Sequence, residues 1–105
     1  MFFVPLLLAL ASATPNDVAA YEAQWNSAVV TAREAQIRAS CNLISWPEAN
    51  IIEARIRVAM QADRRWMLFS RTQQEAILDW RDRIYRRVKE TRKPCSFYAT
   101  RLAAP

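Results

Sequence analysis

Residues 70–93, SRTQQEAILDWRDRIYRRVKETRK, contain the clearest periodic pattern in the chain. Apolar side chains recur there at steps of three and four residues and therefore line one face of a helix. They are Ile77, Leu78, Trp80, Ile84, Tyr85 and Val88. Either Ser70 or Thr72 can begin this helix with a capping box, and Pro94 ends it. We expect a helix over about residues 72–93.

Two earlier segments have the same spacing of apolar side chains. The first, about residues 15–41, begins at Thr14-Pro15-Asn16-Asp17, which places a hydroxyl at the N-cap, proline at N1 and a carboxylate at N3. Asn42 follows this segment and can end a helix in the left-handed conformation, in place of glycine. The second segment, about residues 46–69, begins at Ser45-Trp46-Pro47-Glu48 with the same order of signals.

Three helices of similar length with short connections favour an all-α fold, an antiparallel up-down-up three-helix bundle. In that topology the first and third helices end at the same pole, so Cys41 and Cys95 meet there. Because these are the only two cysteines, we expect one disulfide that closes the bundle. A closed loop of this length stabilises a fold by about 4 kcal/mol on the chain-entropy model. We expect residues 14–105 to form a single helical domain.

The first 13 residues, Met1 to Ala13, are almost wholly apolar and end in Ala11-Ser12-Ala13, the small-x-small pattern that signal peptidase cleaves. This run is too short for the ~20 apolar residues of a spanning helix, so a membrane anchor is the weaker interpretation. We expect cleavage near Ala13 and a secreted or periplasmic protein. An oxidising compartment agrees with the expected disulfide. Since no basic residue precedes Phe2, we also expect translation to start upstream of Met1.

The 105 residues include no histidine and no glycine. Without histidine the chain lacks the usual general base near neutral pH and the commonest ligand of transition metals. Without glycine it lacks the phosphate-binding loops of nucleotide-binding folds. We therefore expect a protein that is not an enzyme and that uses no cofactor and no metal.

Two charges fall on apolar helix faces. On a helical wheel Asp63 lies in the centre of the second apolar stripe and Arg81 in the centre of the third, at similar heights above the connection between them. Glu22 lies at the edge of the first stripe at a similar height. We expect a buried ion pair of Asp63 and Arg81, with Glu22 beside it, that fixes the helix register. A carboxylate-dependent hydrolase is the less favoured alternative, because an intervening arginine would keep both carboxylates ionised.

Charge is unevenly distributed along the chain. Residues 14–54 carry two basic and five acidic side chains, whereas residues 55–105 carry thirteen and five. Most of the basic excess lies on an exposed arc of the third helix, at Arg83, Arg86, Arg87, Lys89, Arg92 and Lys93. Trp46, in the first turn of the second helix, is the aromatic residue that we expect to be exposed for a partner. A solvated face that only keeps the domain soluble remains the alternative.

The segment Phe69-Ser70-Arg71-Thr72-Gln73, followed by Ile77 and Trp80-Arg81, resembles the LTxxQ motif of periplasmic helical stress proteins, the Spy and CpxP chaperone family. Ile44-Ser45-Trp46-Pro47-Glu48 resembles a second, looser copy. The resemblance implies an exported, all-helical and often dimeric protein that shields unfolded clients or senses envelope stress without ATP.

The sequence thus favours an exported, non-enzymatic helical binding protein of the bacterial envelope, either a stress chaperone or sensor or an inhibitor-like binder. Its expected partners are a protein client or an anionic envelope surface such as phospholipid headgroups. Nucleic acid is not expected as a partner outside the cytoplasm. The alternative from another class is a structural or assembly subunit that forms a homodimer.

Overall fold

The computed structural model describes residues 13–103, with side chains through Thr100. The expected signal peptide, residues 1–13, lies outside the described residues except for Ala13. Within the described range every regular element is a helix: α2 (Pro15–Ser40), α3 (Trp46–Ala62), α4 (Arg64–Leu68), α5 (Arg71–Glu90) and α6 (Cys95–Ala103). The prediction of an all-α fold is confirmed for this part of the chain.

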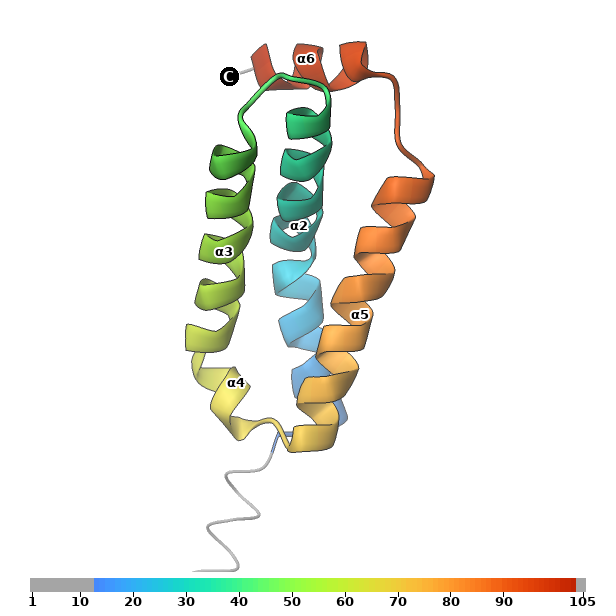
Figure 1. The fold of residues 1–105 in the computed structure, drawn as a ribbon. Coiled ribbons are helices and arrows are strands. Elements are labelled where there is room, and N and C mark those ends of the chain that lie inside the picture. The colour runs from blue at the N-terminus through green and yellow to red at the C-terminus, as the bar shows by residue number, and fades with distance from the viewer. Residues whose placement is uncertain (1–12, 104–105) are drawn as a thin grey trace, which may run out of the picture.

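Figure 1 shows the chain ascending through α2, descending through α3 and α4, and ascending again through α5, with α6 across the upper end. Helix α2 packs against both α3 and α5. It also contacts α6 at the upper end. The helix α2 is therefore the element that holds the other three in place.

The helix starts follow the capping signals of the sequence. Thr14 accepts a hydrogen bond from the Asp17 backbone and Asp17 accepts one from the Thr14 backbone, which completes a capping box at the start of α2. Ser45 caps α3 by accepting a hydrogen bond from the Glu48 backbone N–H at 3.1 Å. At α5 the choice between two hydroxyls is resolved, because Ser70 is the N-cap.

The end of α2 is formed as predicted, with asparagine in place of glycine. Asn42 has φ 60°, and among residues 13–103 it is the residue that adopts positive φ. Its N–H donates to the Ala39 carbonyl at 3.0 Å, and the Leu43 N–H donates to the Arg38 carbonyl at 2.9 Å. These two bonds satisfy carbonyls that the last helical turn leaves open. The turn directs the chain back down into α3.

The predicted helix over residues 46–69 is interrupted at Asp63. Asp63 has φ −62° and ψ 131°, so the chain is extended there, and α3 ends before it while α4 begins after it. The Asp63 side chain accepts a hydrogen bond from the Arg65 backbone N–H at 2.9 Å. Aspartate caps helix starts better than it continues helices, and here it caps α4.

The carboxyl-terminal part also differs from the expectation. Helix α5 ends at Glu90, earlier than the expected 93, and residues Cys95–Ala103 form the additional helix α6. Tyr98 fixes α6 to the bundle, since its side chain is buried and its hydroxyl accepts a hydrogen bond from the Lys93 backbone N–H at 3.1 Å. Helix α6 thus lies across the upper end of the bundle (Figure 1).

Two apolar clusters form the core. Near the α4 end, α2, α3 and α5 contribute a cluster of large side chains, to which Phe69, beyond α4, is added: Tyr21, Val29, Met60, Phe69, Ile77 and Ile84. Trp25, Trp66 and Trp80 pack against this cluster, and for Trp80 this agrees with its predicted place on the apolar face of the third helix. Near the α6 end, Ala35, Ala39 and Ala49 join α2 closely to α3, and no residue of α5 takes part. The upper part of α5 instead packs against the first cluster, through Tyr85 and Val88.

The disulfide adds a covalent connection at the α6 end. Cys41, at the end of α2, is bonded to Cys95, the first residue of α6, with a Cα–Cα distance of 5.7 Å. The bond spans 54 residues of sequence and joins the segment after α5 to the turn after α2. The predicted pairing is confirmed.

Candidate binding surface

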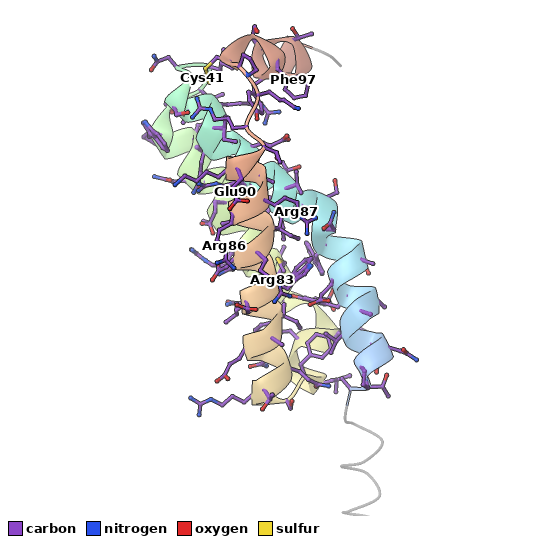
Figure 2. All side chains as sticks on the ribbon, turned by 90° about the vertical axis from the view of Figure 1, so that its right-hand side faces the viewer. Cys41, Arg83, Arg86, Arg87, Glu90 and Phe97 are labelled. Atoms are coloured by element: carbon purple, nitrogen blue, oxygen red, sulfur yellow. A yellow bond between two sulfur atoms is a disulfide. The ribbon has the colours of Figure 1, made fainter. Side chains whose placement is uncertain are left out.

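The basic arc predicted on the third helix lies on α5 and in the segment that follows it. Figure 2 looks onto this side of the molecule, where Arg83, Arg86 and Arg87 lie along α5 close to Glu90. Arg83 is neutralised by an ion pair with Asp79. The remaining five predicted cations are exposed, and within the described part of the chain no carboxylate lies within ion-pair distance of them: Arg86, Arg87, Lys89, Arg92 and Lys93.

A recess of about 300 Å³ adjoins this arc, where the end of α2, the start of α3 and the residues at and after the end of α5 meet. It brings together two predicted arc residues, the predicted aromatic residue and one cation that the sequence analysis did not single out. The lining residues are Arg33, Gln36, Ile37, Ser40, Trp46, Lys89 and Arg92. Three of the seven carry positive charge and none is acidic.

Arg33 is held by uncharged groups. Its Nη1 donates to Gln36 Oε1 at 2.6 Å, and the centre of its guanidinium lies 5.9 Å from the centroid of the Tyr85 ring. Its Nε is buried without a hydrogen-bond partner. The signal for Arg33 was present in the sequence, because it falls four residues after Val29 and four before Ile37 on the buried face of α2. A charge at such a position is unusual unless it is paired or faces a polar site.

Arg92 is positioned beside the disulfide. Its Nη2 lies 3.3 Å from Cys41 Sγ and 3.7 Å from Cys95 Sγ. The guanidinium therefore lies against the bond that closes the fold. Sulfur is a weak acceptor, so the contact leaves the positive charge of Arg92 in place.

Trp46 forms an apolar wall of the recess and is 52% exposed. It is the first residue of α3, where its position is fixed by the Ser45 cap. The expectation that Trp46 is exposed agrees with the structure. Ile37, by contrast, is 5% exposed and lies at the inner side of the recess.

The expected cluster of Asp63, Arg81 and Glu22 does not form. Asp63 accepts hydrogen bonds from Arg65 Nη2 at 2.7 Å and from the indole Nε1 of Trp25 at 3.1 Å. No ion pair joins Arg81 to either carboxylate, and its Nε is buried without a hydrogen-bond partner. The prediction was wrong because the wheel assumed a continuous helix through residue 63, whereas α3 ends there and the carboxylate faces Arg65 and Trp25.

The surroundings of the two carboxylates also differ. The side-chain hydrogen bond from Arg65 holds the pKa of Asp63 well below its usual range, with further contributions from the Arg65 backbone and from Trp25. Burial raises the pKa of Glu22, and the nearby charge of Arg83 opposes this shift. The two groups are not a coupled acid–base pair.

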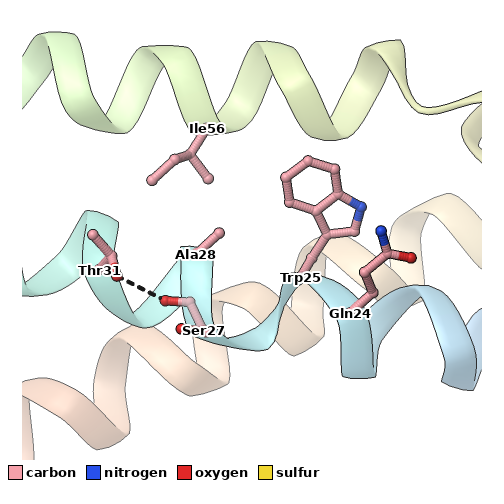
Figure 3. Close-up of a pocket in the computed structure, with 6 residues that line it drawn as sticks. All are labelled: Gln24, Trp25, Ser27, Ala28, Thr31 and Ile56. Atoms are coloured by element: carbon pink, nitrogen blue, oxygen red, sulfur yellow. Dashed lines mark hydrogen bonds between the residues drawn. The ribbon is translucent and has the colours of Figure 1, made fainter.

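A separate open groove of about 460 Å³ lies between α2 and α3. Figure 3 shows the side chains of Trp25, Ala28 and Ile56 along it, with Thr31 donating a hydrogen bond to the Ser27 carbonyl at 2.9 Å. The residues that line it in the described part of the chain are uncharged: Gln24, Trp25, Ser27, Ala28, Thr31 and Ile56.

The residues that resemble the LTxxQ motif perform local structural roles. Ser70 and Gln73 form the capping box of α5, and Gln73 Nε2 also donates to the Ala13 carbonyl at 3.1 Å. Phe69 is buried and meets the Tyr21 ring edge-on, with a centroid distance of 5.1 Å. Helix capping and core packing thus account for these residue types in this chain.

Three comparisons with known proteins, against family models, curated sequences and solved structures, find no match. Among residues 13–103, no three acidic or cysteine side chains are grouped so that they could hold a metal ion. No helix in the same range is long and apolar enough to cross a membrane.

Proposed function

We propose that this disulfide-closed domain is an exported binding protein of the bacterial envelope, without enzymatic activity, that holds an anionic partner at the carboxyl-terminal end of α5. The observation that carries the proposal is the set of five exposed cations without acidic partners, defined above, beside a recess with an exposed tryptophan. Like charges on one short segment repel one another, so they oppose folding unless a partner neutralises them.

The end of α5 differs electrostatically from the rest of the described chain. Elsewhere on the described chain, arginines such as Arg57, Arg65 and Arg71 pair with nearby carboxylates. At the end of α5 the sequence instead places cations in succession, with Glu90 as the acidic residue among them. A concentrated positive potential attracts anionic partners and increases their association rate. The surface is therefore suited to binding an anion.

The test is a binding assay with two anionic probes, poly-L-glutamate and vesicles that contain phosphatidylglycerol. We expect the oxidised protein to bind at least one probe, with an affinity that falls as salt is added. The variant Arg86→Gln/Arg87→Gln should bind more weakly. The control variant Arg55→Gln/Arg64→Gln has the same net charge but changes exposed arginines of α3 and α4, and it should bind like the wild type. Equal loss in both variants, or no binding to either probe, would contradict the proposal.

The resemblance to the Spy and CpxP family adds a chaperone version of this proposal. In that version the anionic partner is an unfolded client protein, and the domain lowers the light scattering of an aggregating acidic client. We expect the Arg86→Gln/Arg87→Gln variant to protect the client less than the Arg55→Gln/Arg64→Gln control does. Equal protection by the two variants would exclude the basic surface from client binding.

A second candidate function is assembly through α3. Ile51 and Val58 lie two turns apart on one face and are 51% and 60% exposed, and Ala54 lies between them. Unpaired apolar side chains in a row are typical of an interface. Sedimentation tests this candidate: a dimer that Val58→Glu dissociates and Leu78→Glu on α5 preserves supports it. A monomer at all concentrations excludes it.

A further inference from the structure

The recess between α2, α3 and the end of α5 has the chemistry of a specific site within the wider basic surface. We infer that it binds a carboxylate next to an aromatic or bulky apolar residue, presented by an acidic segment of a partner protein. This inference rests on the proposed function, since it names the partner class and the site. It adds Arg33, on a different helix from the basic arc, as a residue that determines specificity.

The recess gathers positive charge. Arg33, Lys89 and Arg92 line one concave space, and none of them has a carboxylate within ion-pair distance among the described residues. Walls of low dielectric concentrate the potential inside a recess. Two guanidinium groups also match the planar geometry of a carboxylate, because each presents parallel N–H donors.

Both arginines contact groups that do not neutralise them. Arg33 is held by Gln36 and the face of the Tyr85 ring, while Arg92 lies against the Cys41–Cys95 sulfurs. A long side chain that is already ordered loses less entropy when it binds. Residues whose function is only solubility do not need such contacts, and the cations farther along the arc show none with aromatic rings or sulfur.

The recess also has an apolar part. Trp46 stands at the rim with about half its surface exposed, and Ile37 lies inside. A volume of about 300 Å³ accommodates one or two side chains. An exposed tryptophan beside arginines is the composition of an interaction hot spot. The ligand therefore combines an anion with an aromatic or apolar neighbour.

The shape favours a protein segment over a lipid surface. The recess lies between three segments of the chain, and its lining includes Arg33 and the buried Ile37 of α2. A side chain that projects from a peptide reaches into such a space, whereas a bilayer surface is flat on this scale. Anionic vesicles are consequently expected to contact the outer arc at Arg86 and Arg87 and not Arg33.

The experiment measures fluorescence anisotropy of labelled peptides with the oxidised protein. The probe contains Glu-Phe-Glu in a neutral background, and the comparison peptides contain Gln-Phe-Gln and Glu-Ala-Glu. We expect Arg33→Gln and Arg92→Gln each to weaken binding of the Glu-Phe-Glu peptide about tenfold, the effect of losing one charge-assisted hydrogen bond. The control Arg55→Gln carries the same change in net charge and should alter affinity less than about twofold.

Trp46→Ala provides a second, independent variant, and because the side chain is half exposed we expect the fold to be retained. It should weaken binding of the Glu-Phe-Glu peptide and leave binding of the Glu-Ala-Glu peptide unchanged. Circular dichroism melting verifies that each variant is folded. Equal effects of Trp46→Ala on both peptides would overturn the aromatic part of the inference.

The outcomes separate this inference from the proposed function. If Arg86→Gln/Arg87→Gln reduces peptide binding while Arg33→Gln does not, the recess is excluded and the basic surface stands. If Arg33→Gln weakens vesicle binding but not peptide binding, the recess binds a lipid headgroup and the inference of a protein segment is wrong. If the wild type binds neither the peptides nor poly-L-glutamate and vesicles, both proposals fail.

Discussion

The indole N–H of Trp25 donates a hydrogen bond of 3.1 Å to the carboxylate of Asp63, 38 residues later in the chain. The same carboxylate receives the Arg65 guanidinium and the Arg65 backbone N–H. The Asp63 side chain thus caps α4, binds Arg65 and connects the junction between α3 and α4 to α2. The interruption of the helix is therefore an ordered junction.

Asp63→Ala should lower the free energy of unfolding by about 2–4 kcal/mol, because it removes a helix cap and leaves partly buried donors unsatisfied. Arg81→Met should change it by less than about 1 kcal/mol, since the Arg81 Nε has no hydrogen-bond partner to lose. Urea unfolding of both variants measures the difference. A cost for Arg81→Met as large as that for Asp63→Ala would restore the ion pair expected from the sequence.

The contribution of Asp63 should depend on pH at the acid end. Its pKa in the folded state is depressed, chiefly by the side-chain hydrogen bond from Arg65. The stabilisation is therefore present above the unfolded pKa of about 3.9 and is lost as the pH falls toward the folded value. The difference in the free energy of unfolding between wild type and Asp63→Asn should be smaller at about pH 2.5 than at about pH 6. An equal difference at the two pH values would contradict the lowered pKa of Asp63.

Tyr21 should titrate late in alkaline solution. Burial, followed by the nearby charge of Asp63, raises the pKa of Tyr21 to about 12, and its hydroxyl donates to the Met60 carbonyl at 2.8 Å. This stabilisation is present below the unfolded pKa of about 10 and is lost as the pH rises through the folded value. Absorbance titration of the phenolates should show a last step that Tyr21→Phe removes. A titration curve that is unchanged by this substitution would refute the shift.

Removal of the disulfide should be costly. Cys41→Ser/Cys95→Ser opens a connection across 54 residues, and the expected loss is about 4 kcal/mol in the free energy of unfolding. The reduced wild-type protein serves as the matched control and should unfold at the same denaturant concentration as the double variant. A loss of less than about 1 kcal/mol would show that the unfolded chain is not appreciably restricted by the bond.

The start of α5 offers a comparison of two nearby hydroxyls. Ser70 accepts a hydrogen bond from the Gln73 backbone N–H at 3.1 Å, and Gln73 Oε1 accepts one from the Ser70 N–H at 2.8 Å. Ser70→Ala should cost about 1 kcal/mol. Thr72→Ala, two residues away on the exposed surface, should cost nothing. Similar losses in thermal melts of the two variants would mean that the capping box does not set the start of the helix.

Local signals were sufficient to predict where the long helices begin and how α2 ends. Thr14, Ser45 and Ser70 act through hydrogen bonds to residues three positions later, and Asn42 through its own backbone angle. Such interactions are readable from adjacent residues. The pairing of the cysteines followed from helix lengths and topology, because antiparallel helices bring alternate ends together.

The candidate site was only partly predictable. Lys89, Arg92 and Trp46 were identified by charge and exposure, but the recess depends on Arg33, whose surroundings are set by where α5 passes along α2. The break at Asp63 was missed because an aspartate can either lie within a helix or cap the start of the next one. The spacing of the apolar side chains alone favoured a continuous helix. Both misjudgements concern polar side chains whose partners lie on another element or beyond a helix end.

The separation of the two cysteines has a consequence for the order of maturation. Cys41 precedes α3 and α5 in synthesis, whereas Cys95 follows them, so the thiol of Cys41 has no intramolecular partner until both helices have been made. An intermolecular disulfide is the available error during that interval. Because Arg92 lies against both sulfurs of the closed bond, oxidation also completes the surroundings of this recess residue.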